Sequence, residues 1–329
     1  MSGLAFQYSR AADTGDALTQ ASRPDTAFLA GGTDLLQLWK AGVVAPAGVV
    51  DISRLPLDQM EFVDGRLCLG ALARLSDVAD HPDVTRYHPL IASAILASAS
   101  GQIRNMATVG GNLLQRTRCW YFRSDGLACN KRNPGSGCGA LAGENRQAAL
   151  FGASASCVAT HASDMAVALT ALDAEVEVLG RAGQRRFPLR DLYRLPGETP
   201  ERETNLAAGE LVTGIHVANA SRFAARSTYL KVRDRASFEF AVVSVAAVLR
   251  VENGRIVEAG LAAGGVAPLP WRLTSSEAVL IGSAPDAGAF AAAGEMAVEH
   301  ARPLAHNGFK VALLRNAVIR ALQTIGGEP

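Results

Sequence analysis

The chain contains 329 residues, of which 49% are hydrophobic and 19% are charged. A chain of this size and composition can bury a large core and form two domains, which excludes general disorder. Lysine and arginine together number 32 against 31 acidic residues, for a formal net charge of +1. This balance does not indicate nucleic acid or an anionic membrane surface as a partner.

Two kinds of membrane signal are missing from the sequence. The longest apolar run covers the nine residues 241–249, and Ser244 interrupts it. A membrane-spanning helix needs roughly 20 apolar residues, so we expect no membrane insertion. The first residues also lack a basic segment followed by an apolar one, so we expect no secretion signal on this chain.

The first third of the chain predicts short strands and helices in alternation. Asp64-Gly65 is a strong hairpin signal between two of the strands. Cys68 lies in the second strand of this hairpin, where we expect a small buried core residue. We predict strands at 26–30, 49–52, 60–63 and 66–69, helices at 34–40 and 89–100, and a turn-rich segment at 101–115.

The segment from 116 to 144 is basic, aromatic and rich in Gly and Pro, with no usable period. An irregular stretch of this length indicates a functional or metal-bound loop. Asp164 is placed to cap a helix at 165–172. Further on we predict strands at 174–179, 227–232 and 238–251, a loop at 196–209, a hairpin at Asn253-Gly254 returning through 255–262, and helices at 276–281, 287–300 and 308–323.

Two glycine pairs could hold a nucleotide. Gly31-Gly32 lies at a strand-to-helix junction, and Gly110-Gly111 lies between Thr108 and Asn112. Without a Cβ atom, the backbone can approach a phosphate closely. The pairs match neither the Gly-x-Gly-x-x-Gly nor the Gly-Lys-Ser/Thr motif, so a Rossmann or P-loop site is not predicted. Two such loops could grip a pyrophosphate from both sides, although each could also be an ordinary tight turn.

Four of the five cysteines, Cys119, Cys129, Cys138 and Cys157, fall in one part of the chain with intervals of nine, eight and 18 residues. Zinc sites usually contain tight cysteine pairs, and ferredoxin-type Cys-x2-Cys runs are also absent. Long intervals suit a loop wrapped around a larger object such as an iron–sulfur cube. On spacing alone, zinc and disulfides or free thiols remain alternatives.

The motifs Ala30-Gly31-Gly32-Thr33-Asp34-Leu35 and Thr108-Val109-Gly110-Gly111-Asn112 together resemble the two FAD loops of the xanthine dehydrogenase family, in the medium subunits of molybdenum hydroxylases. The segments 162–166, 231–233 and 240–246 fit the same family. The resemblance covers essentially the whole chain, and the order and spacing of the motifs are more specific than any one of them.

The chain departs from the plain family pattern by an insertion at about 116–160, which contains all four clustered cysteines. This pattern resembles the FAD subunits of bacterial periplasmic aldehyde oxidoreductases, which carry an extra [4Fe-4S] cluster. The β subunits of 4-hydroxybenzoyl-coenzyme A reductases carry a similar insertion and are the nearest alternative. The resemblance implies Cys119, Cys129, Cys138 and Cys157 as the cluster ligands.

The resemblance also implies an α+β fold. We expect a two-part FAD-binding domain of the vanillyl-alcohol-oxidase/PCMH type at 1–220, divided into 1–55 and 56–220, with the Fe–S insertion in the second part. A smaller α+β C-terminal domain should cover 221–329. The expected FAD contacts are Phe28, Leu29, Ala30, Gly31, Gly32, Thr33, Asp34, Leu35, Thr108, Gly110, Gly111, Asn112, Gln115, Asp164, Ile215 and Lys231.

The implied function is electron transfer in a heterotrimer. Substrate would be oxidised at a molybdenum-cofactor large subunit, and [2Fe-2S] centres in a small subunit would carry electrons to FAD in this chain. FAD would then pass them to an external acceptor. Export to the periplasm with a signal-bearing partner is expected, with the cytoplasm as the alternative. A stand-alone FAD oxidase and a zinc-stapled scaffold are the competing hypotheses from other classes.

Overall fold

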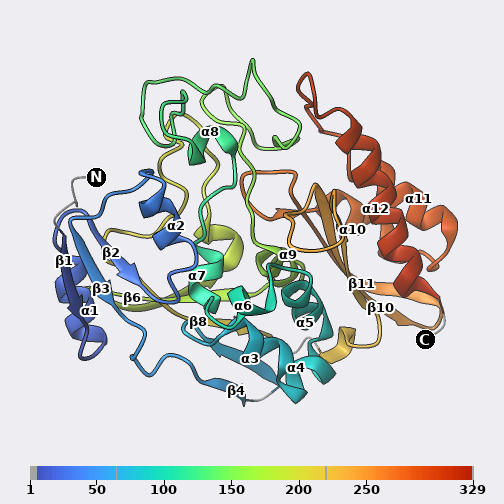
Figure 1. Ribbon diagram of the computed structural model, residues 1–329. Coiled ribbons are helices and arrows are strands. Elements are labelled where there is room, and N and C mark those ends of the chain that lie inside the picture. The colour runs from blue at the N-terminus through green and yellow to red at the C-terminus, as the bar shows by residue number, and fades with distance from the viewer. Residues whose placement is uncertain (1–5, 64, 219–220, 328–329) are drawn as a thin grey trace.

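The computed structural model describes residues 6–63, 65–218 and 221–327, and three β-sheets organise this part of the chain (Figure 1). The first sheet is parallel, with the order β1-β3-β2. Parallel neighbours need a crossover connection, and the segment with helix α2 provides it between β2 and β3. The elements of this part are β1 Gln7–Arg10, α1 Thr14–Ala21, β2 Thr26–Leu29, α2 Leu35–Lys40 and β3 Gly48–Asp51.

The second sheet is antiparallel, with the order β4-β5-β8-β6-β7. The predicted hairpin joins β4 to β5, and Asp64 of its turn lies outside the described residues. β8 was not predicted, yet it fills the centre of the sheet between β5 and β6. The strands are β4 Met60–Val63, β5 Arg66–Gly70, β6 Glu175–Gly180, β7 Gly183–Pro188 and β8 Leu211–Val217.

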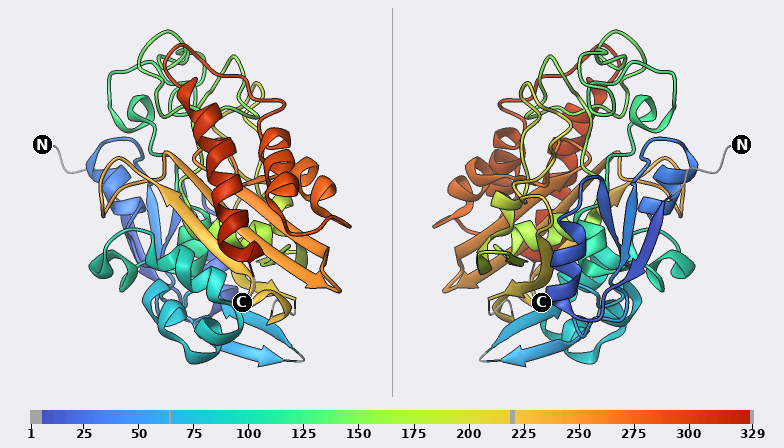
Figure 2. Two further views of the ribbon diagram at one scale, coloured as in Figure 1. Left: turned by 90° about the vertical axis from the view of Figure 1, so that its right-hand side faces the viewer. Right: turned by 90° about the vertical axis from the view of Figure 1, so that its left-hand side faces the viewer.

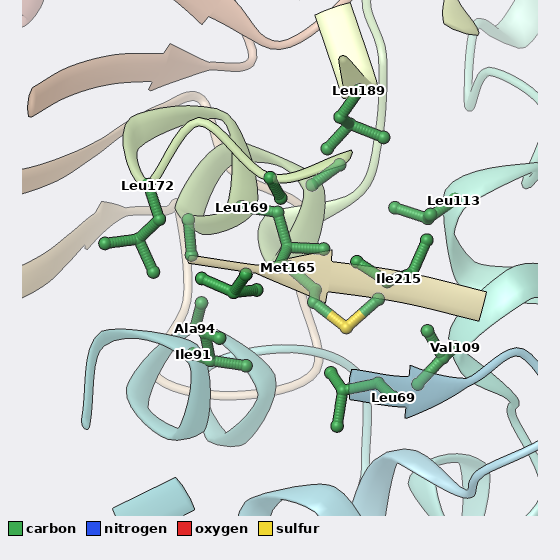
Figure 3. Packing of buried hydrophobic residues seen from close by; sticks show 14 of the residues in the cluster. Leu69, Ile91, Ala94, Val109, Leu113, Met165, Leu169, Leu172, Leu189 and Ile215 are labelled. Carbon is green, nitrogen blue, oxygen red and sulfur yellow. The ribbon is translucent and has the colours of Figure 1, made fainter. Parts of the chain in front are cut away.

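Helix α9 (Asp164–Ala171) lies at the centre of the main core, and all of its residues are buried. Met165 and Leu169 pack toward Ile91 and Ala94 of α5 and toward the second sheet (Figure 3). The segment predicted as turn-rich at 101–115 in fact forms two short helices, α6 and α7. The helices that complete this part are α3 Leu75–Asp80, α4 Pro82–Tyr87, α5 Pro89–Leu96, α6 Gly101–Arg104, α7 Val109–Leu113 and the 3-10 turn η1 Leu189–Leu192.

The third sheet has the order β12-β11-β10-β9, and the helices α10–α12 cover one of its faces (Figure 2). Residues 243–249 of β10 are buried on both faces, since α12 packs on one and α9 on the other, which explains the apolar run in the sequence. Asn253 and Gly254 both have positive φ, as the predicted hairpin requires. The elements are η2 Ser221–Phe223, β9 Ser227–Val232, β10 Val243–Glu252, β11 Arg255–Gly264, β12 Trp271–Arg272, α10 Thr274–Leu280, α11 Ala287–Met296 and α12 Phe309–Gly326.

The insertion at 116–160 forms irregular loops beside the first and third sheets, at the top of Figure 1. Its one helix in the described chain is the four-residue α8 (Trp120–Arg123). Many of its residues are nevertheless buried, including Phe122, Cys129 and Cys157. Within the described residues, no helix combines the length and apolar character needed to cross a bilayer.

Two predictions about single residues are wrong. Ser163, not Asp164, caps α9, because its hydroxyl accepts the amide hydrogen of Ala166 at 2.9 Å. Cys68 is partly exposed on the polar face of the second sheet instead of being buried in the core.

Candidate functional site

The two glycine loops meet at one cleft of about 490 Å³. Gly31-Gly32 follows β2, and Gly110-Gly111 lies in the first turn of α7. A Cβ atom on Gly31 would lie 1.9 Å from the carbonyl oxygen of Met106, just before the second loop. Only a glycine therefore permits the two segments to approach at this distance. Gly32 has a φ of +71°, which also favours glycine.

The first loop offers unused hydrogen-bond donors to the cleft. The amide groups of residues 31–34 donate to no other residue within the described part of the chain. Backbone amides normally have partners, so a ligand rich in acceptor oxygens, such as a diphosphate, would satisfy this row. The first loop thus fits the phosphate-binding role that the sequence predicts for it.

The second loop shapes the wall of the cleft but offers it fewer free hydrogen-bond donors than the first loop. The amide of Gly110 donates to the Ala71 carbonyl at 2.8 Å, and that of Gly111 donates to the Thr108 hydroxyl at 3.2 Å. Both glycines line the cleft without side chains, and Gly111 is exposed there. The second loop therefore forms a smooth wall opposite the donors of the first.

Asp34 connects the first loop to the insertion. Its Oδ2 accepts the backbone amide of Arg116 at 2.8 Å. Its Oδ1 accepts from the guanidinium groups of Arg123 at 2.7 Å and Arg118 at 3.0 Å. Asp34 does not cap α2 with its side chain. The carboxylate thus holds the start of the insertion against the cleft.

A second cavity of about 330 Å³ adjoins the first at the Asp34–Arg118 ion pair, because Asp34 lines one cavity and Arg118 the other. Asp164 lines this second cavity together with Phe240 and Cys119. The Asp34–Arg118 ion pair thus links the walls of the two cavities.

Asp164 and Lys231 form a buried ion pair at 2.8 Å. The Tyr229 hydroxyl donates to the other carboxylate oxygen at 2.6 Å, and the Lys231 ammonium also donates to the Ala97 carbonyl at 3.1 Å. Burial raises the pKa of Asp164, and Lys231 opposes that shift. The pair fixes a cation and a carboxylate next to the second cavity.

Some of the other predicted FAD contacts line the cleft and some do not. Gln115 and Asn112 do not line the cleft. The Gln115 amide donates to the Asn112 carbonyl at 3.0 Å, and the Asn112 side chain accepts from Ser163 at 2.5 Å. Ile215 is fully buried in β8 and points into the core (Figure 3). The structure brings Phe28, Ala30, Thr33, Leu35 and Thr108 to the cleft, and Leu29 packs beside Gly32.

Sequence reasoning missed part of the cleft wall. Ala71 and Leu72 follow β5, and Leu211 and Val212 begin β8, so both strands bring apolar side chains to the cleft. The alternation of Leu211–Val217 was a usable strand signal, but its position between β5 and β6 depends on pairing between distant segments.

The four clustered cysteines are all free thiols. Cys129 and Cys138 are partners in an isolated β-bridge. Burial raises the pKa of the Cys119 thiol to about 11, and the nearby thiols Cys157 and Cys129 contribute to this rise. Burial likewise raises the pKa of Cys157, against the attraction of Lys131. The thiols are thus near enough to influence one another.

Among the residues that the structure describes, no group of three or more His, Cys, Asp or Glu side chains is arranged to hold a single metal ion. This finding does not distinguish the zinc alternative from the [4Fe-4S] cluster, and both stay predictions.

Comparison with known proteins decides the family. The model for the FAD binding domain in molybdopterin dehydrogenase matches residues 4–219, and the model for the CO dehydrogenase flavoprotein C-terminal domain matches residues 228–325. The chain belongs to the FAD-binding subunits of the xanthine dehydrogenase family of molybdenum hydroxylases. This FAD subunit is therefore part of an oxidoreductase, and the prediction of its α+β, two-part FAD-binding fold is confirmed.

Individual relatives agree with this assignment. The FAD subunit is 44% identical over 322 residues to the aldehyde oxidoreductase FAD-binding subunit PaoB of Escherichia coli (strain K12), covering 97% of both chains. It is 30% identical to the glyceraldehyde dehydrogenase medium chain of Sulfolobus acidocaldarius, covering 84% of this chain and 81% of that one. Carbon monoxide dehydrogenase from Hydrogenophaga pseudoflava shares the fold, with a TM-score of 0.77, 24% identity and coverage of 99% and 98%.

Proposed function

We propose that this FAD subunit is the FAD- and [4Fe-4S]-containing electron-transfer subunit of a heterotrimeric molybdenum aldehyde oxidoreductase. Its partners would be a molybdenum-cofactor large subunit and a [2Fe-2S] small subunit, and an external acceptor would receive the electrons. The 44% identity to an aldehyde oxidoreductase FAD-binding subunit across 97% of both chains is the observation that carries the proposal.

The arrangement of the chain supports FAD as its electron carrier. Bound FAD accepts electrons from one partner and releases them to another. The free amides of residues 31–34 would hold its diphosphate, with Gly110-Gly111 as the opposite wall. Lys231, fixed by Asp164 and the Ala97 carbonyl, would place a positive charge that stabilises anionic reduced flavin.

Three observations support a [4Fe-4S] cluster in the insertion. Four free thiols lie there, near enough to influence one another's pKa. The backbone near Cys119 and Cys157 lowers the pKa of both thiols against the effect of burial, which favours thiolates. The insertion also buries Phe122, Cys129 and Cys157 although it is almost free of regular structure, which is expected where a bound group supplies the order.

Metal analysis of single cysteine variants tests the cluster. We expect about four irons per chain in the wild type, and loss of most of them in Cys129→Ser, with protease cleavage appearing within 116–160. Cys68→Ser is the matched control and should keep its iron, because Cys68 lies on the second sheet. Retention of four irons in Cys129→Ser, or iron loss in Cys68→Ser, would exclude the proposed ligand set.

Purification of the complex through a tag on this chain tests the assembly and the reaction class. We expect two additional subunits, molybdenum, flavin absorbance and aldehyde-dependent reduction of an artificial acceptor. A tagged chain that oxidises aldehyde without any partner would instead indicate a stand-alone FAD oxidase.

We propose that the assembled complex reaches the periplasm through a signal on a partner subunit. This proposal follows from the resemblance to periplasmic enzymes. Cell fractionation with and without the partner genes tests it, because the chain should enter the periplasm only when the partners are present.

A further inference from the structure

Three side chains that the proposed function does not use form a hydrogen-bonded chain on the polar face of the second sheet. The sulfur of Cys68 in β5 lies 3.2 Å from Nδ1 of His216 in β8. Nε2 of the same imidazole lies 3.0 Å from Oε2 of Glu177 in β6. A nucleophile, a base and a group that orients the base are thus in contact, in the order that activates thiols in enzymes.

The sheet register produces this arrangement. Cys68 and His216 are direct cross-strand partners, and Glu177 pairs with Gly214, two residues before His216. Gly214 lies beside the point where the imidazole meets the carboxylate, and even a Cβ atom there would be at an ordinary contact distance of 3.6 Å from Nε2. The three side chains therefore need no distortion of the strands to meet.

Glu177 is held in the ionised form that the arrangement requires. Burial opposes its ionisation, but hydrogen bonds from Arg186 at 3.0 Å and Thr213 at 3.0 Å outweigh this effect and lower its pKa. An ionised carboxylate accepts the Nε2–H hydrogen, so Nδ1 carries the lone pair that faces Cys68. The imidazole is thus oriented to accept the thiol proton.

We propose that Cys68 is a nucleophilic thiol and a site of oxidative modification by peroxides, with His216 as its base and Glu177 as the residue that positions His216. Cys68 is partly exposed, so a small oxidant can reach it. The sulfur attacks one oxygen of hydrogen peroxide, an S–O bond forms and the O–O bond breaks. Sulfur loses two electrons, and its proton passes through His216 to the leaving hydroxide, giving a sulfenic acid and water.

This proposal is independent of the proposed electron-transfer function, because Cys68, His216 and Glu177 line neither of the two site cavities. Burial raises the pKa of Cys68 and lowers that of His216, so the resting pair is a neutral thiol and a neutral imidazole. The thiol must therefore lose its proton during the attack, as in general-base catalysis, which typically contributes about 10²- to 10⁴-fold.

The rate of sulfenic acid formation at Cys68 tests the proposal in the full chain. The protein is treated with hydrogen peroxide in the presence of dimedone, and the peptide that contains Cys68 is quantified by mass spectrometry. We expect labelling of native Cys68 to be at least about tenfold faster than in the urea-unfolded chain, where the thiol has no base. If Cys68 is labelled no faster in the native protein than in the unfolded chain, the proposal is wrong. Folding would then only shield the thiol from the oxidant, as it does for any packed side chain.

Variants identify the base. His216→Gln should reduce native labelling to the unfolded rate or below, while Glu177→Gln should reduce it less. His300→Gln removes an exposed histidine and should leave the rate unchanged. Equal labelling of His216→Gln and the wild type would show that the imidazole does not act on the thiol. If His216→Gln does not fold, the comparison of native and unfolded wild-type protein still decides the question.

Discussion

Arg123 donates to Asp34 at 2.7 Å, which joins the insertion to the loop that lines the glycine cleft, although the two residues lie 89 positions apart in sequence. Arg123 also donates to the carbonyls of Thr117 and Arg116 at 2.9 and 3.1 Å. One guanidinium group therefore organises the first turn of the insertion and fixes it to Asp34. The proposed FAD and iron–sulfur sites share this contact.

We predict that Arg123→Gln loosens the insertion and weakens FAD binding together. Removal of a hydrogen bond between partly buried charged groups costs about 2 kcal/mol, and Arg118 and the Arg116 amide remain on Asp34. Limited proteolysis should cut within 116–160, and FAD should dissociate more readily. Arg190→Gln, on an exposed arginine, is the control. Proteolysis without any change in FAD affinity would show that the two sites are not coupled through Asp34.

Gly111→Val should give a folded protein that is poor in flavin. A Cβ atom at this position meets only the Thr108 hydroxyl, at 2.9 Å, and the remaining side chain would project into the cleft. The ratio of flavin absorbance to protein should fall several-fold, while the circular dichroism spectrum stays close to that of the wild type. Gly101→Val is the matched control, because a Cβ atom there meets nothing. Full flavin occupancy in Gly111→Val would remove the second loop from the FAD site.

Because Lys231 and Asp164 form a buried ion pair, we expect substitutions at the two positions to have non-additive effects on the free energy of unfolding. Lys231→Met leaves a buried carboxylate without its cation and should lower the free energy of unfolding by about 3 kcal/mol or more. The double variant Asp164→Asn/Lys231→Met removes both charges and should recover much of this loss, since the amide oxygen of the new side chain can still accept from Tyr229. Urea unfolding of Lys231→Met, Asp164→Asn and the double variant measures the difference, with the exposed Lys40→Met as control. Additive effects would contradict a direct interaction.

Local signals in the sequence predicted those features that depend on few neighbouring residues. Asn253-Gly254 forms the expected hairpin because positive φ at both positions is a property of the turn itself. The glycine pairs indicated the cleft because the close approach of Gly31 to Met106 demands a residue without a side chain. The irregular insertion was predicted because its composition allows neither helical nor strand periodicity.

Features that depend on distant partners were not predictable in this way. Ser163 and Asp164 are both good helix caps, and Ser163 takes the role because Lys231 and Tyr229 bind the Asp164 carboxylate. Cys68 becomes part of a polar cluster because β8 pairs with β5 and brings His216 beside it, 148 residues further along the chain. No local pattern around either residue indicates that pairing.

His88 should make the protein sensitive to acid. Its side chain is buried, Nδ1 has no hydrogen-bond partner among the described residues, and burial lowers its pKa to about 4. An unfolded histidine has a pKa of about 6.5, so between these values the unfolded chain binds more protons than the folded one. Stability must therefore fall as the pH drops from about 6.5 to 4, and at pH 5 the loss amounts to about 2 kcal/mol.

His88→Phe should reduce this pH dependence by that amount, because phenylalanine keeps an aromatic ring next to Phe62 and does not titrate. Urea unfolding at pH 7.5 and pH 5, with FAD held at one concentration, measures the change. Some acid sensitivity should remain, since burial also lowers the pKa of His161 to about 4. His300→Gln should keep the full wild-type pH dependence, because the His300 side chain is 82% exposed. An unchanged pH dependence in His88→Phe would mean that the buried imidazole is not a source of the acid sensitivity.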